Sequence, residues 1–142
     1  MKNVARLLDE KGTDVYTVAP DASVYRALEL MAEHGVGALV VLEDDRPVGI
    51  ISERDYARKV ILLDRGSRKT TVAEIMTSDL KTVTRAQTTD DCMALMTKKR
   101  IRHLPVVEDG VLLGIISIGD VVRAVISEQQ HLIEQLEGYI TS

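Results

Sequence analysis

Two polar pairs in this chain have the residue types and the spacing to bind a nucleotide. Ser52 and Asp55 follow the apolar run that ends at Ile51, and Ser117 and Asp120 follow a second run of the same kind. A serine at the start of a helix lies beside unpaired backbone N–H groups, which favour an anion such as a phosphate. An aspartate one turn later can accept hydrogen bonds from both hydroxyls of a ribose. These residue types are therefore compatible with a nucleotide site.

The same Ser-x-x-Asp spacing is also typical of a capping box, in which the two side chains satisfy backbone N–H groups and need no ligand. The spacing alone favours the capping role, so both interpretations stay open at this point. Arg54 lies next to Asp55 and could reach a phosphate, although Gly119 stands at the equivalent place in the second pair.

The elements that must position these pairs are duplicated. Residues 17–61 align without a gap onto residues 82–126, and 16 of the 45 positions are identical. The densest match joins residues 49–55 to residues 114–120, which contain the two Ser-x-x-Asp pairs. A unit of about 60 residues buries too little surface to be stable alone. We therefore expect the two copies to pack around a pseudo-two-fold axis, with a cleft between them.

Each copy has the pattern of a β-α-β-β-α unit, which predicts an α/β (α+β) fold. In the first copy we predict a strand, an amphipathic helix, a hairpin and a second helix at residues 15–18, 24–34, 38–51 and from 52 onward. In the second copy the same elements are predicted near residues 81–84, at 89–99, at 104–116 and from 117 onward.

The repeat also sets the predicted domain boundaries. The first domain covers residues 1–66 with its lead-in segment, the second covers residues 67–128, and a helical extension covers residues 129–142. The extension carries an apolar stripe that needs a partner surface, either on its own pair or on another chain. This stripe consists of Leu132, Ile133, Leu136, Tyr139 and Ile140.

Composition excludes several classes of protein. With 142 residues, 45% of them hydrophobic and 28% charged, the chain fits a globular domain rather than a disordered segment. Its longest apolar stretch, residues 111–116, is too short to span a membrane, and acidic residues at positions 9 and 10 argue against a signal peptide. We therefore expect a cytoplasmic location without membrane contact. A net charge of −4 and the absence of Phe and Trp argue against nucleic acid.

Catalysis is not expected. The single cysteine, Cys92, and the three histidines have no metal-ligand spacing, and nothing resembles a nucleophile motif. We therefore predict no catalytic residue, no metal and no required cofactor.

Three segments resemble those of tandem cystathionine-β-synthase (CBS) domain pairs, also called Bateman modules. They are the doubled Gly-Ile-Ile-Ser-x-x-Asp motif, residues 101–107 and residues 72–77. The resemblance covers about residues 4–128 and implies a regulatory ligand that contains adenosine. AMP is the first expectation, with ADP, ATP, NAD or S-adenosylmethionine as alternatives. It also implies a disc-like homodimer and an unidentified protein partner that the module regulates. A purely structural dimerisation module with empty clefts is the alternative.

The resemblance further implies that each Ser/Asp pair works with the first strand and the post-helix segment of the other copy. One predicted site is made by Ser52, Arg54, Asp55, Lys81, Thr82, Ile101, Arg102 and His103. The other is made by Tyr16, Thr17, Val36, Gly37, Ala38, Ile115, Ser117 and Asp120.

The two sites are expected to differ in charge. Residues 98–103 hold five basic residues in six, whereas the equivalent residues 33–38 hold one histidine and one glutamate. Cations near a phosphate form charge-assisted hydrogen bonds, so the Asp55 site is expected to favour the more anionic ligand. The apolar faces of the helices that flank the hairpins predict a homodimer.

Overall fold

The structure is a computed structural model that describes residues 2–141. Residue 1, where the first predicted domain begins, and residue 142, where the predicted helical extension ends, lie outside this range. The chain divides into two compact units. The copy-one unit comprises Asp14–Lys81 and Val107–Leu113, and the copy-two unit comprises the residues up to Thr13, Thr82–Val106 and the residues from Gly114 onward. The predicted boundary between residues 66 and 67 rests on the repeat alone and stays a prediction.

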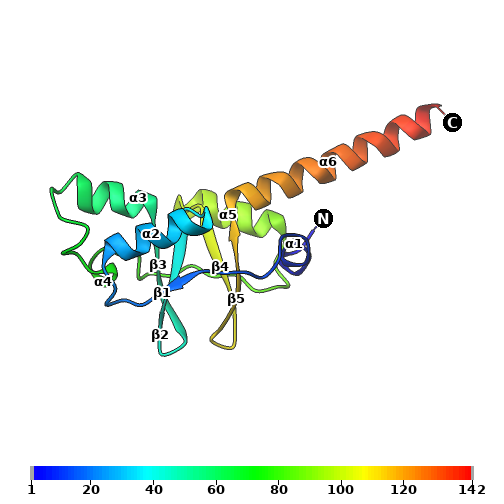
Figure 1. Ribbon diagram of the computed structural model, residues 1–142. Helices are drawn as coiled ribbons and strands as arrows, with labels where there is room; N and C mark the ends of the chain where they lie inside the picture. Colours follow the sequence, from blue (N-terminus) through cyan, green and yellow to red (C-terminus); the bar gives the residue numbers. More distant parts are fainter. Residues whose placement is uncertain (1, 142) are drawn as a thin grey trace. The chain divides into compact units, whose positions relative to one another are not determined.

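The copy-one unit is built on a three-stranded sheet of order β1-β2-β3 (Figure 1). The β1–β2 pair is parallel and the β2–β3 pair is antiparallel. The helix between β1 and β2 begins after Ser23, whose side chain accepts the backbone N–H of Arg26, and ends at Gly35 in the left-handed conformation. The elements are β1 (Thr17–Val18), α2 (Val24–His34), β2 (Ala38–Glu43), β3 (Arg46–Ser52), α3 (Glu53–Tyr56), the π-helix η1 (Ala57–Ile61) and α4 (Val72–Ile75).

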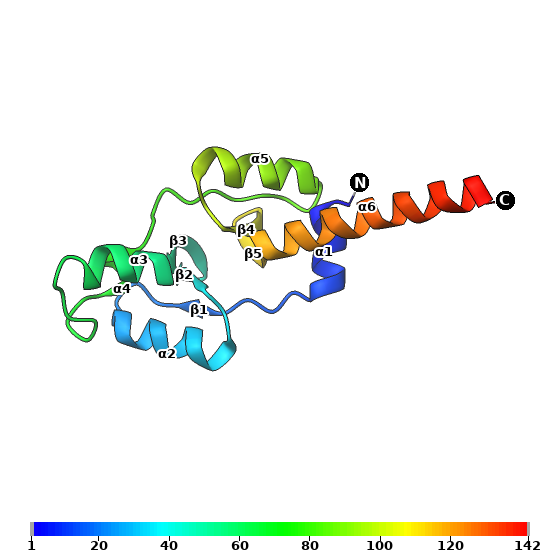
Figure 2. The same ribbon diagram turned by 90° about the horizontal axis from the view of Figure 1, so that it is seen from above.

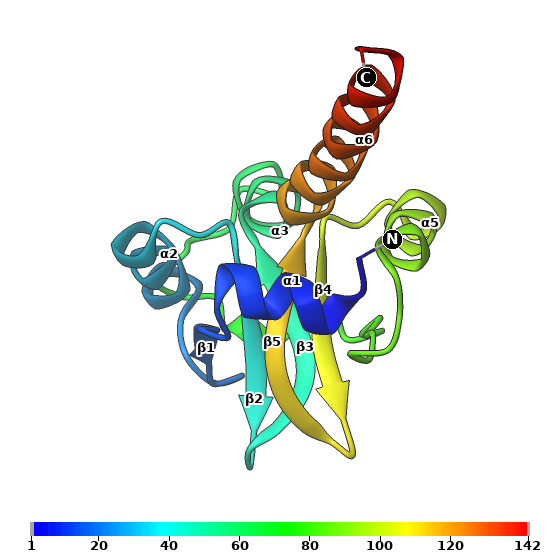
Figure 3. The same ribbon diagram turned by 90° about the vertical axis from the view of Figure 1, so that its right-hand side faces the viewer.

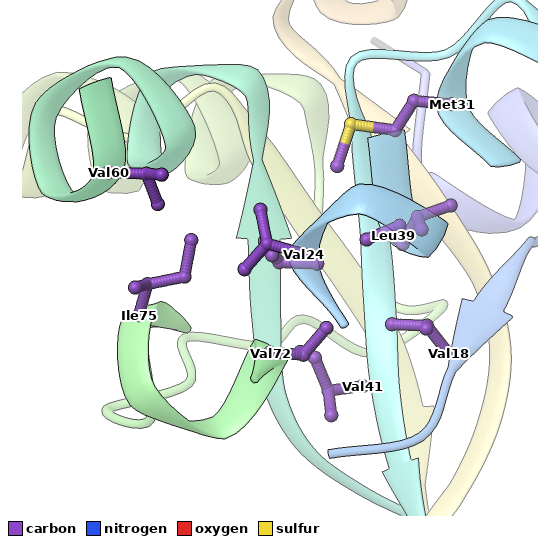
Figure 4. Packing of buried hydrophobic residues seen from close by; sticks show 10 residues of the cluster. Val18, Val24, Met31, Leu39, Val41, Val60, Val72 and Ile75 are labelled. Carbon is purple, nitrogen blue, oxygen red and sulfur yellow. The ribbon is translucent and has the colours of Figure 1, made fainter. Parts of the chain in front are cut away.

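The core of the copy-one unit is aliphatic, because the chain has neither Phe nor Trp. Figure 4 shows this cluster, with Val60 of η1 and Ile75 of α4 on one side and Val18 and Leu39 on the other. Full burial of such a side chain stabilises the fold by roughly 1.5–3 kcal/mol. The buried members are Val18, Val24, Ala27, Met31, Leu39, Val41, Ile51, Val60, Val72 and Ile75.

The copy-two unit places two helices against the long C-terminal helix. Both α5 and α1 contact α6, and Figure 2 shows α1 beside the first half of α6. The β4–β5 hairpin turns at residues 109 and 110, both with positive φ. Its tip, Val107–Leu113, is grouped with the copy-one unit, and the rest belongs to the copy-two unit. The elements are α1 (Val4–Lys11), α5 (Thr89–Lys99), β4 (His103–Glu108), β5 (Val111–Ser117) and α6 (Ile118–Thr141).

The lead-in helices α1 and α4 dock on their copies in the same way. In the copy-one unit, the backbone N–H of Val72 donates to Ala22 O at 2.8 Å; in the copy-two unit, the N–H of Val4 donates to Gln87 O at 2.8 Å. Residues 22 and 87 are equivalent in the repeat. Figure 3 shows α1 crossing β5, where Leu8 packs against Gly114. The second copy is thus completed by the first residues of the chain.

The mixed α/β fold class is confirmed, and α5 spans the predicted residues 89–99. The strand predicted near residues 81–84 is wrong, because only a single parallel bridge, Val83 to Val106, forms there. In the first copy, the N–H of Val40 donates to Tyr16 O at 3.2 Å. The equivalent residue in the second copy is Pro105, which has no N–H, so this hydrogen bond cannot form.

Candidate functional site

The Ser52–Asp55 pair forms a capping box at the start of α3. The backbone N–H and the hydroxyl of Ser52 donate to Asp55 Oδ2 at 2.9 and 3.1 Å, and the Asp55 N–H donates to Ser52 Oγ at 3.2 Å. Asp55 Oδ1 lies 3.2 Å from the ammonium of Lys59, one turn further along the chain. The Asp55 side chain is 13% exposed, so its carboxylate is held in one orientation near the surface.

The Ser117–Asp120 pair repeats this geometry at the start of α6. The N–H and hydroxyl of Ser117 donate to Asp120 Oδ2 at 2.8 and 2.9 Å, and the Asp120 N–H donates back to Ser117 Oγ at 3.2 Å. The carboxylate is 7% exposed. Both pairs therefore form the capping hydrogen bonds that the spacing favours, and both present a fixed carboxylate at the end of a strand.

The Asp120 carboxylate also forms ion pairs with two basic side chains. The ammonium of Lys11 lies 2.6 Å from Asp120 Oδ2, and the guanidinium of Arg123 lies 2.7 Å from Oδ1. Burial by itself would raise the pKa of Asp120, but the hydrogen bonds from Lys11 and Ser117 outweigh it and lower the pKa below its usual value. Asp120 is therefore an anion at neutral pH.

Lys11 also forms a hydrogen bond with a backbone carbonyl of β5. Its ammonium donates to Ile115 O at 2.8 Å. In the copy-one unit, the equivalent carbonyl, Ile50 O, accepts the backbone N–H of Thr77 at 2.9 Å. The copies diverge here because α1 continues to Lys11 whereas α4 ends at Ile75.

His103, the first residue of β4, lies in the same charged surroundings. Burial lowers the pKa of His103, and the positive charges of Lys11 and Arg102 lower it further, whereas the charge of Asp120 acts in the opposite direction. A neutral imidazole is therefore favoured beside the Lys11–Asp120 pair.

Each post-helix segment meets the Ser/Asp pair of its own copy. The N–H of Glu53 donates to Gly37 O at 3.0 Å, and the N–H of Ile118 donates to Arg102 O at 2.8 Å. Ala38 is the ladder partner of Ser52. Contacts between these segments and the pair of the other copy, which the resemblance implies, stay predictions.

The remaining predicted residues have assigned places within their units. The Tyr16 ring stacks on the His34 ring, with 3.7 Å between centroids and an interplanar angle of 6°. The Lys81 ammonium pairs with Asp79 at 3.1 Å. The others lie in β1 (Thr17), in α3 (Arg54), after α2 (Val36), before the Val83 bridge (Thr82), after α5 (Ile101) and in β5 (Ile115).

The residues predicted from the sequence do not include Lys11, Lys59 and Arg123. A signal for Lys11 exists: the dipeptide Val4-Ala5 repeats as Val72-Ala73, which marks two lead-in segments of the same kind. The spacing of three residues between Asp120 and Arg123 is typical of an ion pair on one helix face.

Three other features of the described residues bear on function: possible metal ligands, the cysteine and the apolar character of the helices. Within residues 2–141 there is no group of three or more His, Cys, Asp or Glu side chains placed to hold a metal. Cys92 is buried, and burial raises the pKa of its thiol to about 11. No helix in the same range is long and apolar enough to cross a membrane.

Known proteins resemble this chain over most of its length. The family model described as "CBS domain" matches residues 6–62 and again residues 72–127. A mitochondrial CBS domain-containing protein of Arabidopsis thaliana is 46% identical over 125 residues, which are 84% of this chain and 61% of that protein. This chain therefore spans less than two thirds of that relative.

Solved structures share the fold. A protein with CBS domains from Burkholderia ambifaria is 52% identical, with a TM-score of 0.87 over 90% of this chain and 96% of the other. A CBS domain pair crystallised with 5′-methylthioadenosine and S-adenosyl-L-methionine is 25% identical, with a TM-score of 0.80 over 90% and 98% of the two chains. Since the two family matches also coincide with the two copies of the repeat, this chain belongs to the CBS-domain family and carries two CBS domains.

Proposed function

We propose that this CBS pair is a regulatory module that binds an adenosine-containing nucleotide, AMP in the first place, with its ribose on Asp55 or Asp120. ADP, ATP, NAD and S-adenosylmethionine are the alternative ligands. The module regulates a protein partner and performs no catalysis of its own. A cytoplasmic location is part of the same proposal, although the Arabidopsis relative is named as mitochondrial.

The observation that carries the proposal is the pair of matched carboxylates. Asp55 and Asp120 are fixed by the same three hydrogen bonds to the preceding serine, in copies that are 65 residues apart. Charge-assisted hydrogen bonds from neighbouring hydroxyls to a fixed carboxylate are stronger than neutral ones. The geometry thus suits a vicinal diol, which a ribose supplies.

A related structure and the local charge give further support. The CBS pair at 25% identity was crystallised with two adenosine derivatives. Basic side chains lie close to Asp120, namely Lys11 and Arg123. Such cations favour a ligand that carries phosphate in addition to ribose. A ligand that prefers one arrangement of the two copies would shift the chain toward that arrangement, and this shift is the signal that a partner can detect.

Calorimetric titration of the whole chain tests the proposal. AMP is expected to bind saturably, and at about one hundred times its dissociation constant it should stabilise the fold by about 2.7 kcal/mol. GMP serves as the matched control, because it has the same ribose and phosphate but a different base. If none of AMP, ADP, ATP, NAD and S-adenosylmethionine gives heat or a thermal shift, the chain is a structural dimerisation module instead.

Self-association is part of the proposal, and exposed apolar side chains support it. On the helices that follow the two hairpins, Ile61 is 56% exposed and Ile126, its equivalent in the repeat, is 56% exposed. Leu62, next to Ile61, is 75% exposed. Apolar faces of this kind on a small chain mark contact surfaces between subunits.

A homodimer is expected to have twice the chain mass of 15.7 kDa in light scattering at micromolar concentration. Ile126→Asp should shift the particle toward the single-chain mass, because burying an unpaired carboxylate at an interface is costly. Ser127→Asp adds the same charge at the neighbouring exposed position and is the control. A wild-type chain that scatters as a monomer contradicts the prediction.

A further inference from the structure

Asp120 Oδ2 has no acceptor capacity left for a ribose hydroxyl. Two carboxylate oxygens offer about four acceptor sites. The Ser117 N–H, the Ser117 hydroxyl and the Lys11 ammonium donate to Oδ2, and the Arg123 guanidinium donates to Oδ1. A vicinal diol that places one hydroxyl on each carboxylate oxygen must therefore displace a donor from Oδ2.

Of the three donors on Asp120 Oδ2, Lys11 is the one that can leave most readily. The Ser117 donors belong to the capping hydrogen bonds, so their loss would expose the start of α6. Lys11 instead reaches Asp120 from another helix, through a flexible stem of four carbons, and its side chain is 29% exposed. The ammonium has three donors and keeps Ile115 O as a second anchor. It can therefore turn away from the carboxylate and stay at the site.

The Asp55 site differs in this respect. Within residues 2–141, Asp55 receives the two Ser52 donors and the ammonium of Lys59, which leaves room for a further donor. The ammonium of Lys59 is less tightly held, at 3.2 Å, and its side chain is 42% exposed. The carbonyl that corresponds to Ile115 O is Ile50 O, and it accepts the backbone N–H of Thr77 instead of a lysine ammonium.

We propose that Lys11 is the residue that makes the Asp120 site specific for a phosphorylated nucleoside. The ribose hydroxyls displace the Lys11 ammonium from Asp120, and the displaced ammonium then binds the phosphate of the same ligand. A nucleoside without phosphate breaks the Lys11–Asp120 ion pair and offers the ammonium no new anion. A nucleotide replaces that ion pair with one between Lys11 and its own phosphate. This inference rests on the proposed binding of ribose by Asp120. It adds a cation to the Asp120 site, whereas the basic residues 98–103 are expected at the Asp55 site.

The test compares AMP with adenosine by calorimetry in an Asp55→Ala chain, so that only the Asp120 site is titrated. Lys11→Met is expected to strengthen adenosine binding and to weaken AMP binding. The ratio of the two dissociation constants should change by about tenfold or more, since each exchange replaces a charge-assisted hydrogen bond. Lys11→Arg keeps the charge and should restore most of the preference for AMP. Arg6→Met removes an exposed cation of the same helix and is the matched control.

Each outcome separates the inference from the proposed function. If AMP and adenosine both bind and Lys11→Met leaves their ratio unchanged, the inference is overturned while the proposed function stands. The inference is also overturned if Arg6→Met changes the ratio as much as Lys11→Met does. The loss of any positive charge on α1 would then explain the effect. If neither ligand binds the Asp55→Ala chain, ribose binding by Asp120 fails and the inference fails with it. Retained α-helical circular dichroism shows that Lys11→Met has not unfolded α1.

Discussion

A chain that carries both Asp55→Ala and Asp120→Ala is expected to bind AMP at least about a hundredfold more weakly than the wild type. Each carboxylate is held at the start of a helix with its orientation fixed by a serine. A ribose makes two hydrogen bonds to such a carboxylate, and a charge-assisted hydrogen bond contributes about 1.5–3 kcal/mol. The loss of two such bonds corresponds to a hundredfold change or more. Calorimetry with AMP, repeated with adenosine, measures the effect with and without the phosphate.

The control for this experiment is Asp91→Ala. Asp91 forms a capping box of the same geometry at the start of α5, where its Oδ2 accepts the N–H of Thr88 at 2.9 Å. This variant therefore loses a helix cap of about 1 kcal/mol, as the site variants do, but it leaves both candidate sites intact. AMP binding that survives in the double variant would show that the two aspartates are helix caps only.

Gly49→Ala is expected to destabilise the copy-one unit by about 1–3 kcal/mol. A Cβ at this position would lie 2.8 Å from Met76 Sδ and 2.9 Å from the carbonyl oxygen of Thr77. The second contact is with backbone, so it cannot be relieved by rotating a side chain. Thr77 O also accepts the N–H of Ile50 at 3.0 Å, and the added methyl group would push this bridge apart. Urea denaturation measures the change in unfolding free energy.

Gly114→Ala is the matched variant, because Gly114 occupies the same position in the second copy. Its Cβ would lie 2.7 Å from Leu8 Cδ2, while the next nearest atom is 3.6 Å away. The end of a leucine side chain can change rotamer, so a smaller loss of stability is expected than for Gly49→Ala. Equal losses from the two variants would mean that the close contact of Met76 and Thr77 with Gly49 does not hold.

Local structure could be predicted from the sequence because its signals act within a few residues. Ser23 and Gly35 mark the two ends of α2, since a side-chain oxygen caps the first turn and glycine adopts the left-handed conformation that ends the last. The hairpin turn at residues 109 and 110 follows from the same kind of short-range preference. The prediction of a strand near residues 81–84 is wrong because the hydrogen bonds of that strand depend on Pro105, which is more than twenty residues away.

The residue types of the candidate site could be predicted from the sequence, but the contacts between them could not. The doubled Ser-x-x-Asp motif identifies two carboxylates, and the structure shows that both take part in capping. Spacing could not decide between a capping box and a ligand site, because the same two side chains serve both purposes. What differs between the copies is the set of cations on each carboxylate, and these cations come from different elements.

By itself, the sequence determined the repeat, the order of helix, hairpin and helix in each copy, the family and the two aspartates, because matching residues at a fixed offset favour the same local structure twice. Only the tertiary structure decided that Lys11, 109 positions before Asp120, pairs with it at 2.6 Å. The pairing requires the N-terminal helix to dock on the second copy and to run one turn further than α4 does on the first. Contacts over such a separation depend on which surfaces pack together, and packing is decided by the whole of the buried surface rather than by any short pattern.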